Sequence, residues 1–333
     1  MKTLLLLGAV GFVTLMPKPA VGQSLIVPDD TLGAERSQVT TVGDIERIAG
    51  GARRSQNLFH SFEEFNVSEG RGAIFESPLG LENIFSRVTG SNPSEIFGTL
   101  GVEGAANLFF LNPNGIVFSE NASLDIQGSF VGSTGTSFNF ADGSEFNAVS
   151  PESSLLTVSV PLGLQHGPSA PKATISNRGA IAVGQDLTLS AGVLDLEGQI
   201  VAGENLTLRA ADLLRIRDSA AEPFVAASGG EMLVQGDRAV DIFALNHPES
   251  GLFSGEDMVL RSANAVGGDA HYWSGGNFRV ERLTEDVGDL FSPKDPVIRA
   301  LGDVAFNNHL GSSLHILAGG SVDVGTIFVT GVD

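Results

Sequence analysis

The 333-residue chain contains no cysteine. Its stability cannot come from disulfide bonds, so it has to come from the burial of apolar side chains and from backbone hydrogen bonds. A chain without cysteine also carries no covalent crosslink that would stop it from passing through a narrow pore as an extended polypeptide. The absence of cysteine therefore excludes a small disulfide-stabilised scaffold and is compatible with export in an unfolded state.

Basic residues are scarce. The chain has 19 Lys and Arg against 39 Asp and Glu, which gives a formal net charge of −20 and a pI near 4.5. Recognition of phosphate groups needs a basic patch, so nucleic acids and anionic membrane surfaces are poor partners for this chain. We interpret the acidic surplus as a means of keeping an extracellular surface soluble.

A long apolar run occurs once, at the N-terminus. Lys2 is followed by an apolar stretch over residues 4–16, and Ala20-Val21-Gly22 places small residues before Gln23. The stretch is shorter than the roughly 20 residues that span a membrane. This pattern predicts a signal peptide over residues 1–22, cleaved near Gly22-Gln23. The mature chain is expected to be secreted or displayed at the cell surface.

Sustained helical periodicity is almost absent, and residues 43–49 are the best candidate for a helix. The 42 glycines and the many Val, Leu, Ile and Phe residues instead predict an all-β fold. Thirteen of the 21 phenylalanines lie between Phe59 and Phe146. A Pro- and Gly-rich run at residues 161–172 separates this aromatic region from the rest of the chain, which predicts a domain boundary there.

Residues 172–333 repeat the pattern Gly-x-x-apolar-x-apolar. The copies begin at residues 184, 203, 229, 255, 275, 301 (a looser copy) and 319. Each copy indicates a glycine turn and a short strand, and a period of about 20 residues is typical of a β-solenoid. We expect Leu187 to stack on Leu206 and then on Met258, with the longer repeats forming loops at one corner. The alternative is a β-sandwich with regular hairpins.

The aromatic region shows the same pattern of short strands separated by turn residues, with larger side chains in the strands. Short strands are predicted at residues 73–77, 83–90, 95–102, 107–111, 115–119 and 123–132, and their phenylalanines are expected to stack inside a solenoid. Between two of these strands lies Asn112-Pro113-Asn114-Gly115. Asn-Pro and Asn-Gly are strong turn dipeptides, so this segment predicts a corner at which the Asn side chains cap backbone groups.

A search for catalytic and metal-binding motifs finds none. The six histidines are scattered, and we interpret them as surface or loop residues. The same holds for the adjacent carboxylates of Asp29 and Asp30. The acidic turns at Asp186, Glu204 and Asp257 lack the regular glycine spacing of calcium-binding repeats, so no metal and no cofactor is predicted.

The main alternative function is that of an extracellular polysaccharide-active enzyme, because parallel β-helices host such enzymes. It would need clustered carboxylates on one strand face. Arg215 and Arg217 have no carboxylate cluster aligned with them by the repeat. The chain is therefore not predicted to be an enzyme. A structural surface protein without specific binding is the other alternative.

Three segments carry a resemblance to a known family: residues 57–67, 82–100 and 107–134. They resemble the N-terminal secretion (haemagglutination activity) domain of filamentous haemagglutinin-type, TpsA-like exoproteins of two-partner secretion, most closely the cyanobacterial type. The family's Asn-Pro-Asn-Gly-Ile motif falls on Asn112, Pro113, Asn114, Gly115 and Ile116. A second Asn-Pro-Asn-Leu motif, frequent in the family, is replaced by ESPLGLENIF at residues 76–85.

The resemblance implies a right-handed parallel β-helix with an N-terminal capping region, in which residues 23–165 form the secretion domain. An outer-membrane TpsB-type β-barrel is the implied partner. The exported chain would act as an adhesin or haemagglutinin on glycans or proteins of host or neighbouring cells. Candidate residues for partner recognition or capping are Asn57, Phe59, Phe62 and Phe65. The end of the chain at residues 331–333 lacks a polar cap, so we expect a fragment of a longer exoprotein.

Overall fold

The computed structural model describes residues 24–153, 156–157, 159, 161–165 and 173–331. These residues form strands and two short 3₁₀ helices, Gly33–Glu35 and Pro151–Ser153, and they include no α-helix. No helix within these ranges is long and apolar enough to cross a membrane. The predicted signal peptide and residues 166–172 of the predicted boundary lie outside the described residues.

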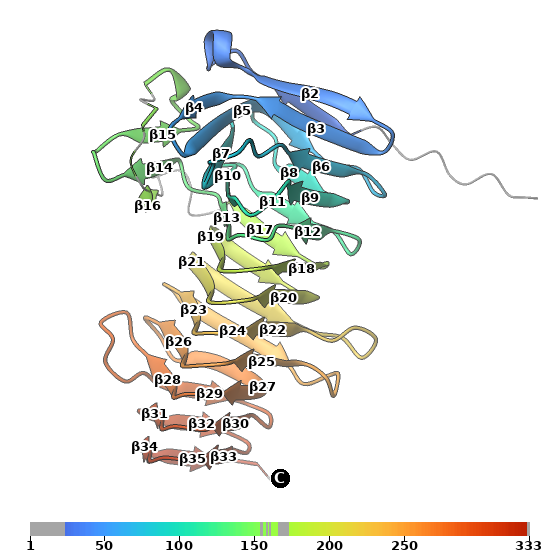
Figure 1. Cartoon of the computed structure of the whole chain (residues 1–333). Helices are drawn as coiled ribbons and strands as arrows, with labels where there is room; N and C mark the ends of the chain where they lie inside the picture. The colour runs from blue at the N-terminus through green and yellow to red at the C-terminus, as the bar shows by residue number, and fades with distance from the viewer. Residues whose placement is uncertain (1–23, 154–155, 158, 160, 166–172, 332–333) are drawn as a thin grey trace, which may run out of the picture.

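The chain winds into a stack of coils, and each coil contributes strands to three sheets (Figure 1). We call these sheets faces 1, 2 and 3 in the order in which the chain visits them. Strands of successive coils pair in parallel along each face. Parallel pairing along the stack is incompatible with a β-sandwich. The predicted all-β parallel β-helix is therefore confirmed.

The three faces are built as follows. Face 1 contains β5 (Asn57–Asn66), β7 (Asn83–Val88), β10 (Asn107–Leu111), β13 (Phe130–Ser133), the first halves of β19 (Leu187–Leu196) and β21 (Leu206–Arg217), β23 (Met232–Gly236), β26 (Met258–Ser262), β28 (Phe278–Glu281), β31 (Val304–Phe306) and β34 (Val322–Val324). Face 2 contains β8 (Ser94–Ile96), β11 (Ile116–Phe118), β17 (Thr174–Asn177), the second halves of β19 and β21, β24 (Ala239–Ala244), the first half of β27 (Val266–Ser274), β29 (Leu290–Ser292), β32 (His309–Gly311) and β35 (Ile327–Val329). Face 3 contains β3 (Ile45–Gly50), β6 (Gly72–Phe75), β9 (Thr99–Val102), β12 (Ser123–Asp125), β18 (Ala180–Val183), β20 (Gln199–Ala202), β22 (Val225–Ser228), β25 (Gly251–Ser254), the second half of β27, β30 (Val297–Ala300) and β33 (His315–Ala318).

The predicted repeats stack in register on face 1. Leu187 pairs with Leu206, as expected, and the row continues through Met232 to Met258 and Phe278. The expected contact of Leu206 with Met258 is wrong, because the coil that begins at residue 229 lies between them. Alternate side chains of each strand point into one continuous apolar core, as the period of two requires.

Each repeat begins with glycine for a steric reason. A Cβ atom on Gly203 would lie 2.1 Å from the carbonyl oxygen of Gly184 in the preceding coil. The same holds at Gly229 against Gly203 (2.2 Å) and at Gly255 against Gly229 (2.0 Å). A side chain at these positions would push neighbouring coils apart, so the glycines form a close-packed corner between faces 3 and 1.

The long repeats do not place their extra residues at one corner, as the sequence predicted. Residues 218–224 and 245–250 project between faces 2 and 3, whereas residues 282–289 project between faces 1 and 2 (Figure 1). Any corner of a solenoid faces solvent and can lengthen without disturbing the core. Spacing between copies reports only the length of a coil and not the corner that carries the insertion.

The first coil is covered by an N-terminal cap, drawn in blue in Figure 1. Strands β1 (Leu25–Pro28) and β4 (Ala52–Arg54) pair antiparallel with β5, and β2 (Ser37–Val42) pairs antiparallel with β3. The helix predicted at residues 43–49 is wrong, because these residues form the turn of this hairpin and most of β3. Glu46 and Ile48 alternate inward along β3, which is strand periodicity.

Most predicted strands of the aromatic region are confirmed, but two of them are each divided by a corner. Residues 95–102 contribute to β8 and β9, and residues 123–132 contribute to β12 and β13. A glycine lies at each division: a Cβ on Gly98 would be 2.1 Å from the Arg71 carbonyl oxygen, and one on Gly128 would be 2.7 Å from the Ala105 carbonyl oxygen. These corners follow the same packing rule as the repeats.

The phenylalanines form two cores rather than the single internal stack that was expected. Phe62 and Phe65 point into the solenoid, whereas Phe59, Phe85 and Phe109 point outward from face 1. The three outward rings stack with centroid separations of 5.1 and 4.6 Å. They are covered by an antiparallel sheet of β14 (Ser137–Phe140), β15 (Glu145–Asn147) and β16 (Pro161–Gln165), which extends from the solenoid between β13 and β17.

Candidate functional site

The predicted corner at residues 112–115 connects β10 on face 1 to β11 on face 2. Asn112 is fully buried, and its Nδ2 donates to the Asn92 carbonyl oxygen and to the Ser94 hydroxyl, each at 3.0 Å. Its Oδ1 accepts a hydrogen bond from the Asn114 N–H at 2.9 Å, which is an Asx-turn. The structure therefore shows the backbone capping expected of this asparagine.

The rest of the motif fixes the corner between its neighbouring coils. The Asn114 Nδ2 donates to the Gly90 carbonyl oxygen in the preceding coil at 2.8 Å. Gly115 has a φ of +129°, and a Cβ there would lie 2.9 Å from the Thr174 carbonyl oxygen of the next coil. Ile116 is fully buried, Pro113 is half-buried and Asn114 is exposed. The motif thus joins three coils and presents mainly Asn114 to solvent.

The four residues predicted for recognition or capping are all buried. Asn57 begins a row of corner asparagines: Asn83 Nδ2 donates to Asn57 Oδ1 and Asn107 Nδ2 donates to Asn83 Oδ1, both at 3.0 Å. Asn57 Nδ2 also donates to the Ser159 carbonyl oxygen at 2.8 Å. Phe59 lies in the outer aromatic core, and Phe62 and Phe65 lie in the solenoid core.

A buried arginine that the sequence did not single out links three distant segments. Arg87 Nε donates to the Ser61 hydroxyl and Nη2 donates to the Thr31 hydroxyl, both at 2.9 Å. Nη1 donates to the Asn147 carbonyl oxygen at 2.6 Å, and the guanidinium lies 4.3 Å from the centre of the Phe146 ring. Burial lowers the pKa of Arg87 to about 10, although the Asp29 carboxylate opposes this shift. The side chain therefore stays charged at neutral pH.

Asp29 belongs to the same network, so its interpretation as a solvated surface carboxylate is wrong. It accepts hydrogen bonds from the hydroxyls of Thr31 (2.6 Å), Ser61 (2.7 Å) and Thr89 (2.6 Å). Burial alone would raise the pKa of Asp29, but these hydroxyl donors hold it below its ordinary value. The neighbouring Asp30 is exposed, as expected.

Two of the histidines also differ from the prediction. His60 and His309 are buried in the stack rather than lying on the surface. His60 Nδ1 lies 3.0 Å from the Ser37 hydroxyl, and burial lowers the pKa of the ring to about 3. His60 is thus neutral at physiological pH. His166 lies outside the described residues.

The acidic turn residues take part in corner hydrogen bonds. Asp186 Oδ1 accepts from the backbone N–H and the Nδ2 of Asn205, each at 3.0 Å, and Asp257 holds Asn277 in the same way. Among the residues that the structure describes, no group of three or more His, Cys, Asp or Glu side chains could hold a metal ion.

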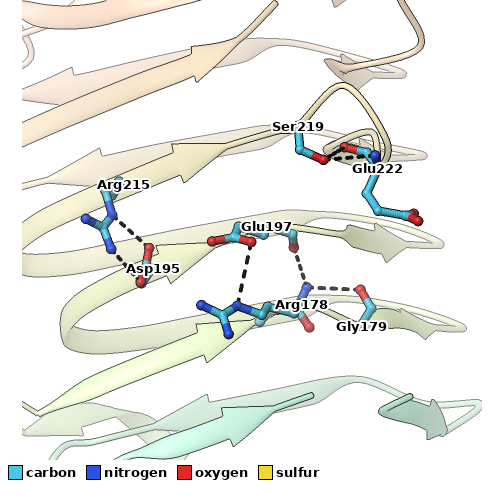
Figure 2. Close-up of polar contacts among 8 residues, drawn as sticks. Arg178, Gly179, Asp195, Glu197, Arg215, Ser219 and Glu222 are labelled. Carbon is cyan, nitrogen blue, oxygen red and sulfur yellow. Dashed lines mark hydrogen bonds and ion pairs between the residues drawn. The ribbon is translucent and has the colours of Figure 1, made fainter. Parts of the chain in front are cut away.

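The arginines of the repeat region do have aligned carboxylates, which corrects the sequence analysis. Parallel register places Asp195, Arg215 and Asp241 in one row on face 2. Arg215 Nε and Nη2 bind the two Asp195 oxygens at 2.8 and 2.7 Å, and Arg217 pairs with Asp241. Figure 2 shows the first of these pairs beside Arg178, whose Nε lies 3.6 Å from Glu197. The charges of this row neutralise one another between coils.

The comparisons with known proteins assign the chain to a family. A family model described as the TPS secretion domain matches residues 24–280, and the chain therefore belongs to this family. A heme/hemopexin-binding protein of Haemophilus influenzae is 29% identical over 94 residues, which are 28% of this chain and 10% of that protein. The chain thus spans about a tenth of the length of this curated relative.

Two solved structures are similar to the chain. The HMW1 secretion domain from Haemophilus influenzae has 14% sequence identity and a TM-score of 0.43, with 93% of this chain and 100% of that chain covered. The filamentous hemagglutinin secretion domain has 18% identity and a TM-score of 0.36, with 91% of this chain and 96% of that chain covered.

Membership of this family confirms the resemblance to TpsA-like exoproteins, whereas the cyanobacterial type stays a prediction. The chain is a secreted exoprotein of the two-partner secretion type, and its domain implies an outer-membrane TpsB-type transporter as partner. The matched family is defined by a secretion function and not by an enzymatic one, in line with the prediction that the chain is not an enzyme.

Proposed function

We propose that the chain is an adhesin-like exoprotein whose N-terminal domain, residues 23–165, is recognised by an outer-membrane TpsB-type barrel. A signal peptide over residues 1–22, cleaved near Gly22-Gln23, would first carry it across the inner membrane. The repeats over residues 172–333 would then fold outside the cell and carry the adhesive activity. The observation that supports this proposal is the TPS family match over residues 24–280.

The burial of the motif residues suggests when recognition occurs. Asn57, Phe59, Phe62, Phe65 and Asn112 are all inaccessible in the folded chain. A barrel that reads these side chains directly has to contact the chain before it folds. Once folded, the same side chains stabilise coils outside the cell and oppose backward movement through the barrel. One set of residues would thus serve both steps of export.

Partner-dependent export is tested by expressing the full chain with and without a co-expressed TpsB-type barrel. We expect the protein in the culture medium or on the cell surface only when the barrel is present. Equal export without a barrel would overturn the proposal. Detection of the periplasmic protein in both strains controls for expression and for the first export step.

The adhesive role is tested separately on purified protein. Adhesion to host or neighbouring cells would appear as saturable binding of the chain to intact cells. Export that depends on the barrel but yields a protein with no saturable binding would instead support a structural surface protein. The protein used in this test should include the terminal coil around β35. Phe328 and its neighbours in that strand are exposed and available to contact a cell surface.

A further inference from the structure

Face 3 of the repeat region carries an outward row of large side chains with an unusual composition. Parallel pairing aligns Phe253 with Trp273, Trp273 with Arg299, and Arg299 with Leu317. Trp273 is the single tryptophan of the chain, and 45% of its surface is exposed. The row covers three strand spacings, or about 14 Å along the solenoid.

These side chains form a groove rather than isolated surface residues. Trp273, Arg299, Leu301 and Leu317 line an open groove of about 380 Å³ between consecutive coils. Phe253 extends the apolar strip on one side, since it is aligned with Trp273 in the same outward row and is 37% exposed. Leu301, at the rim, is 67% exposed. The lining of the groove is mainly apolar, and Arg299 is its one charged residue.

The charge of this surface differs from that of the rest of the molecule. Face 3 has a second outward row beside the row of Trp273, and it contains His271, Val297 and His315. Between Val225 and Leu317, neither of these two rows contains an Asp or Glu. The chain as a whole has a net charge of −20. On this face His315 forms an ion pair with Asp295 at 3.1 Å.

Arg299 differs from the arginines of face 2 in having no partner. Arg215 and Arg217 are each neutralised by a carboxylate of an adjacent coil (Figure 2 shows the Arg215 pair). The Arg299 side chain makes no hydrogen bond or ion pair with any residue in the described part of the chain. Its guanidinium can therefore bind an anionic group in bidentate geometry, beside an indole that can stack on an apolar ring face.

We propose that this groove binds an anionic sugar, with a pyranose ring stacked on Trp273 and its carboxylate or sulfate bound by Arg299. The C–H groups of a pyranose face match the apolar lining, and the negative group matches the unpaired guanidinium. This inference rests on the proposed function only in taking the ligand to belong to a cell surface outside the producing cell. Binding is measured on purified protein, so its outcome does not depend on the export test.

The single tryptophan makes the test direct, because all tryptophan fluorescence comes from the groove. Full-length protein is titrated with trigalacturonate, 3′-sialyllactose and a sulfated disaccharide, and with neutral maltotriose and lactose. We expect the fluorescence to shift with at least one anionic sugar, with a Kd on the order of 1 mM, and not with the neutral sugars. Comparison of the carboxylated and sulfated probes identifies the anionic group.

Variants assign the binding to the groove. Arg299→Ala and Trp273→Ala are each expected to raise the Kd about tenfold or more, the second measured by ligand-detected NMR. Arg209→Ala and Phe291→Ala remove an exposed arginine and an exposed aromatic from faces 1 and 2, and they are expected to leave the Kd unchanged. Unchanged circular dichroism of all four variants confirms that they fold.

Three outcomes would overturn the proposal. The first is no fluorescence or NMR response to any anionic sugar at 10 mM, on the order of ten times the expected Kd. The second is binding that triglutamate matches or competes away at equal concentration, which would indicate an acidic peptide as the occupant. The third is an equal loss of binding in Arg209→Ala and Arg299→Ala, which would indicate nonspecific attraction to positive charge.

Discussion

Arg87 provides the sharpest test of what holds the N-terminal domain together. Its guanidinium donates to Ser61, Thr31 and Asn147 over distances between 2.6 and 2.9 Å. Hydrogen bonds to a charged group contribute about 1.5 kcal/mol or more each, and the contact with Phe146 adds about 1 kcal/mol. Removing a buried charge also removes its desolvation cost, which offsets part of this sum. We therefore expect Arg87→Ala to destabilise the domain by about 4 kcal/mol.

The loss should be local. Asp29 keeps its three hydroxyl donors in the variant, so its carboxylate stays hydrogen-bonded in the cap. The outer antiparallel sheet loses its ties to the solenoid through Asn147 and Phe146. Hydrogen exchange of amides in β14 and β15 should accelerate by about a thousandfold, which corresponds to 4 kcal/mol. Amides of the repeats from β19 onward should exchange as in the wild type, since coils there contact only their neighbours.

Arg36→Ala is the matched control, because Arg36 lies in the same cap but forms an exposed ion pair with Asp30 at 3.1 Å. Exposed pairs contribute at most about 1 kcal/mol, so exchange in β14 and β15 should change less than about fivefold. Arg87→Lys should restore part of the protection, since an ammonium keeps the charge but not the fork of donors. Acceleration below about fivefold in Arg87→Ala would refute the assignment of Arg87 as the link between cap and outer sheet.

Three further predictions concern the corners and the buried histidine. Asn112→Ala removes two donated and two accepted hydrogen bonds, so it should lower stability by about 3 kcal/mol and reduce export to the medium. Undiminished export would leave the motif without the structural role given to it. Gly203→Ala should lower the urea midpoint of unfolding, because the new Cβ would lie 2.1 Å from the Gly184 carbonyl oxygen. Gly143→Ala should cost only about 1 kcal/mol, because Gly143 has a φ of +80° but open space around it. Equal midpoints for the two variants would contradict the packing argument. The pKa of His60 is about 3 when folded against 6.5 unfolded, so the unfolded chain binds more protons between these values and stability falls as pH falls through that window. His60 alone should account for a loss of about 2 kcal/mol between pH 6.5 and pH 4.5, and the denaturation profile of His60→Gln should lack this component. Identical profiles would show that His60 does not titrate in this way.

The sequence was sufficient to predict the stack and most of its register, for a physical reason. The glycine of each repeat is needed where neighbouring coils pack backbone against backbone, and the apolar positions three and five residues later face inward. Both requirements recur once per coil, so the pattern records the period directly. The corner at Asn112 could be predicted on similar grounds, because its Asx-turn is a local property of the residues involved.

The outer aromatic core could not be predicted from the same evidence. Phe59 and Phe62 look alike in a strand pattern, yet one points outward and the other inward. The difference depends on a sheet formed by residues 137–165, far away in the sequence, which covers one side of face 1. Arg87 was missed for the same reason, since its partners at Thr31 and Asn147 lie about 60 residues away on either side. Buried hydrogen bonds between residues so far apart in the chain leave no local sequence pattern.

These long-range links separate the folding of the two halves of the chain. Asn57 donates to the carbonyl oxygens of Thr157 and Ser159, about 100 residues later, so the N-terminal unit cannot close until most of residues 23–165 are available. Each later coil closes over a spacing of 18 to 26 residues and contacts only the coil before it. Contacts of long sequence separation form slowly, and local ones form quickly. In a chain that emerges with its N-terminus first, the slow closure of the N-terminal unit would therefore come first. The closed unit would present a complete sheet edge on which each following coil can add without delay.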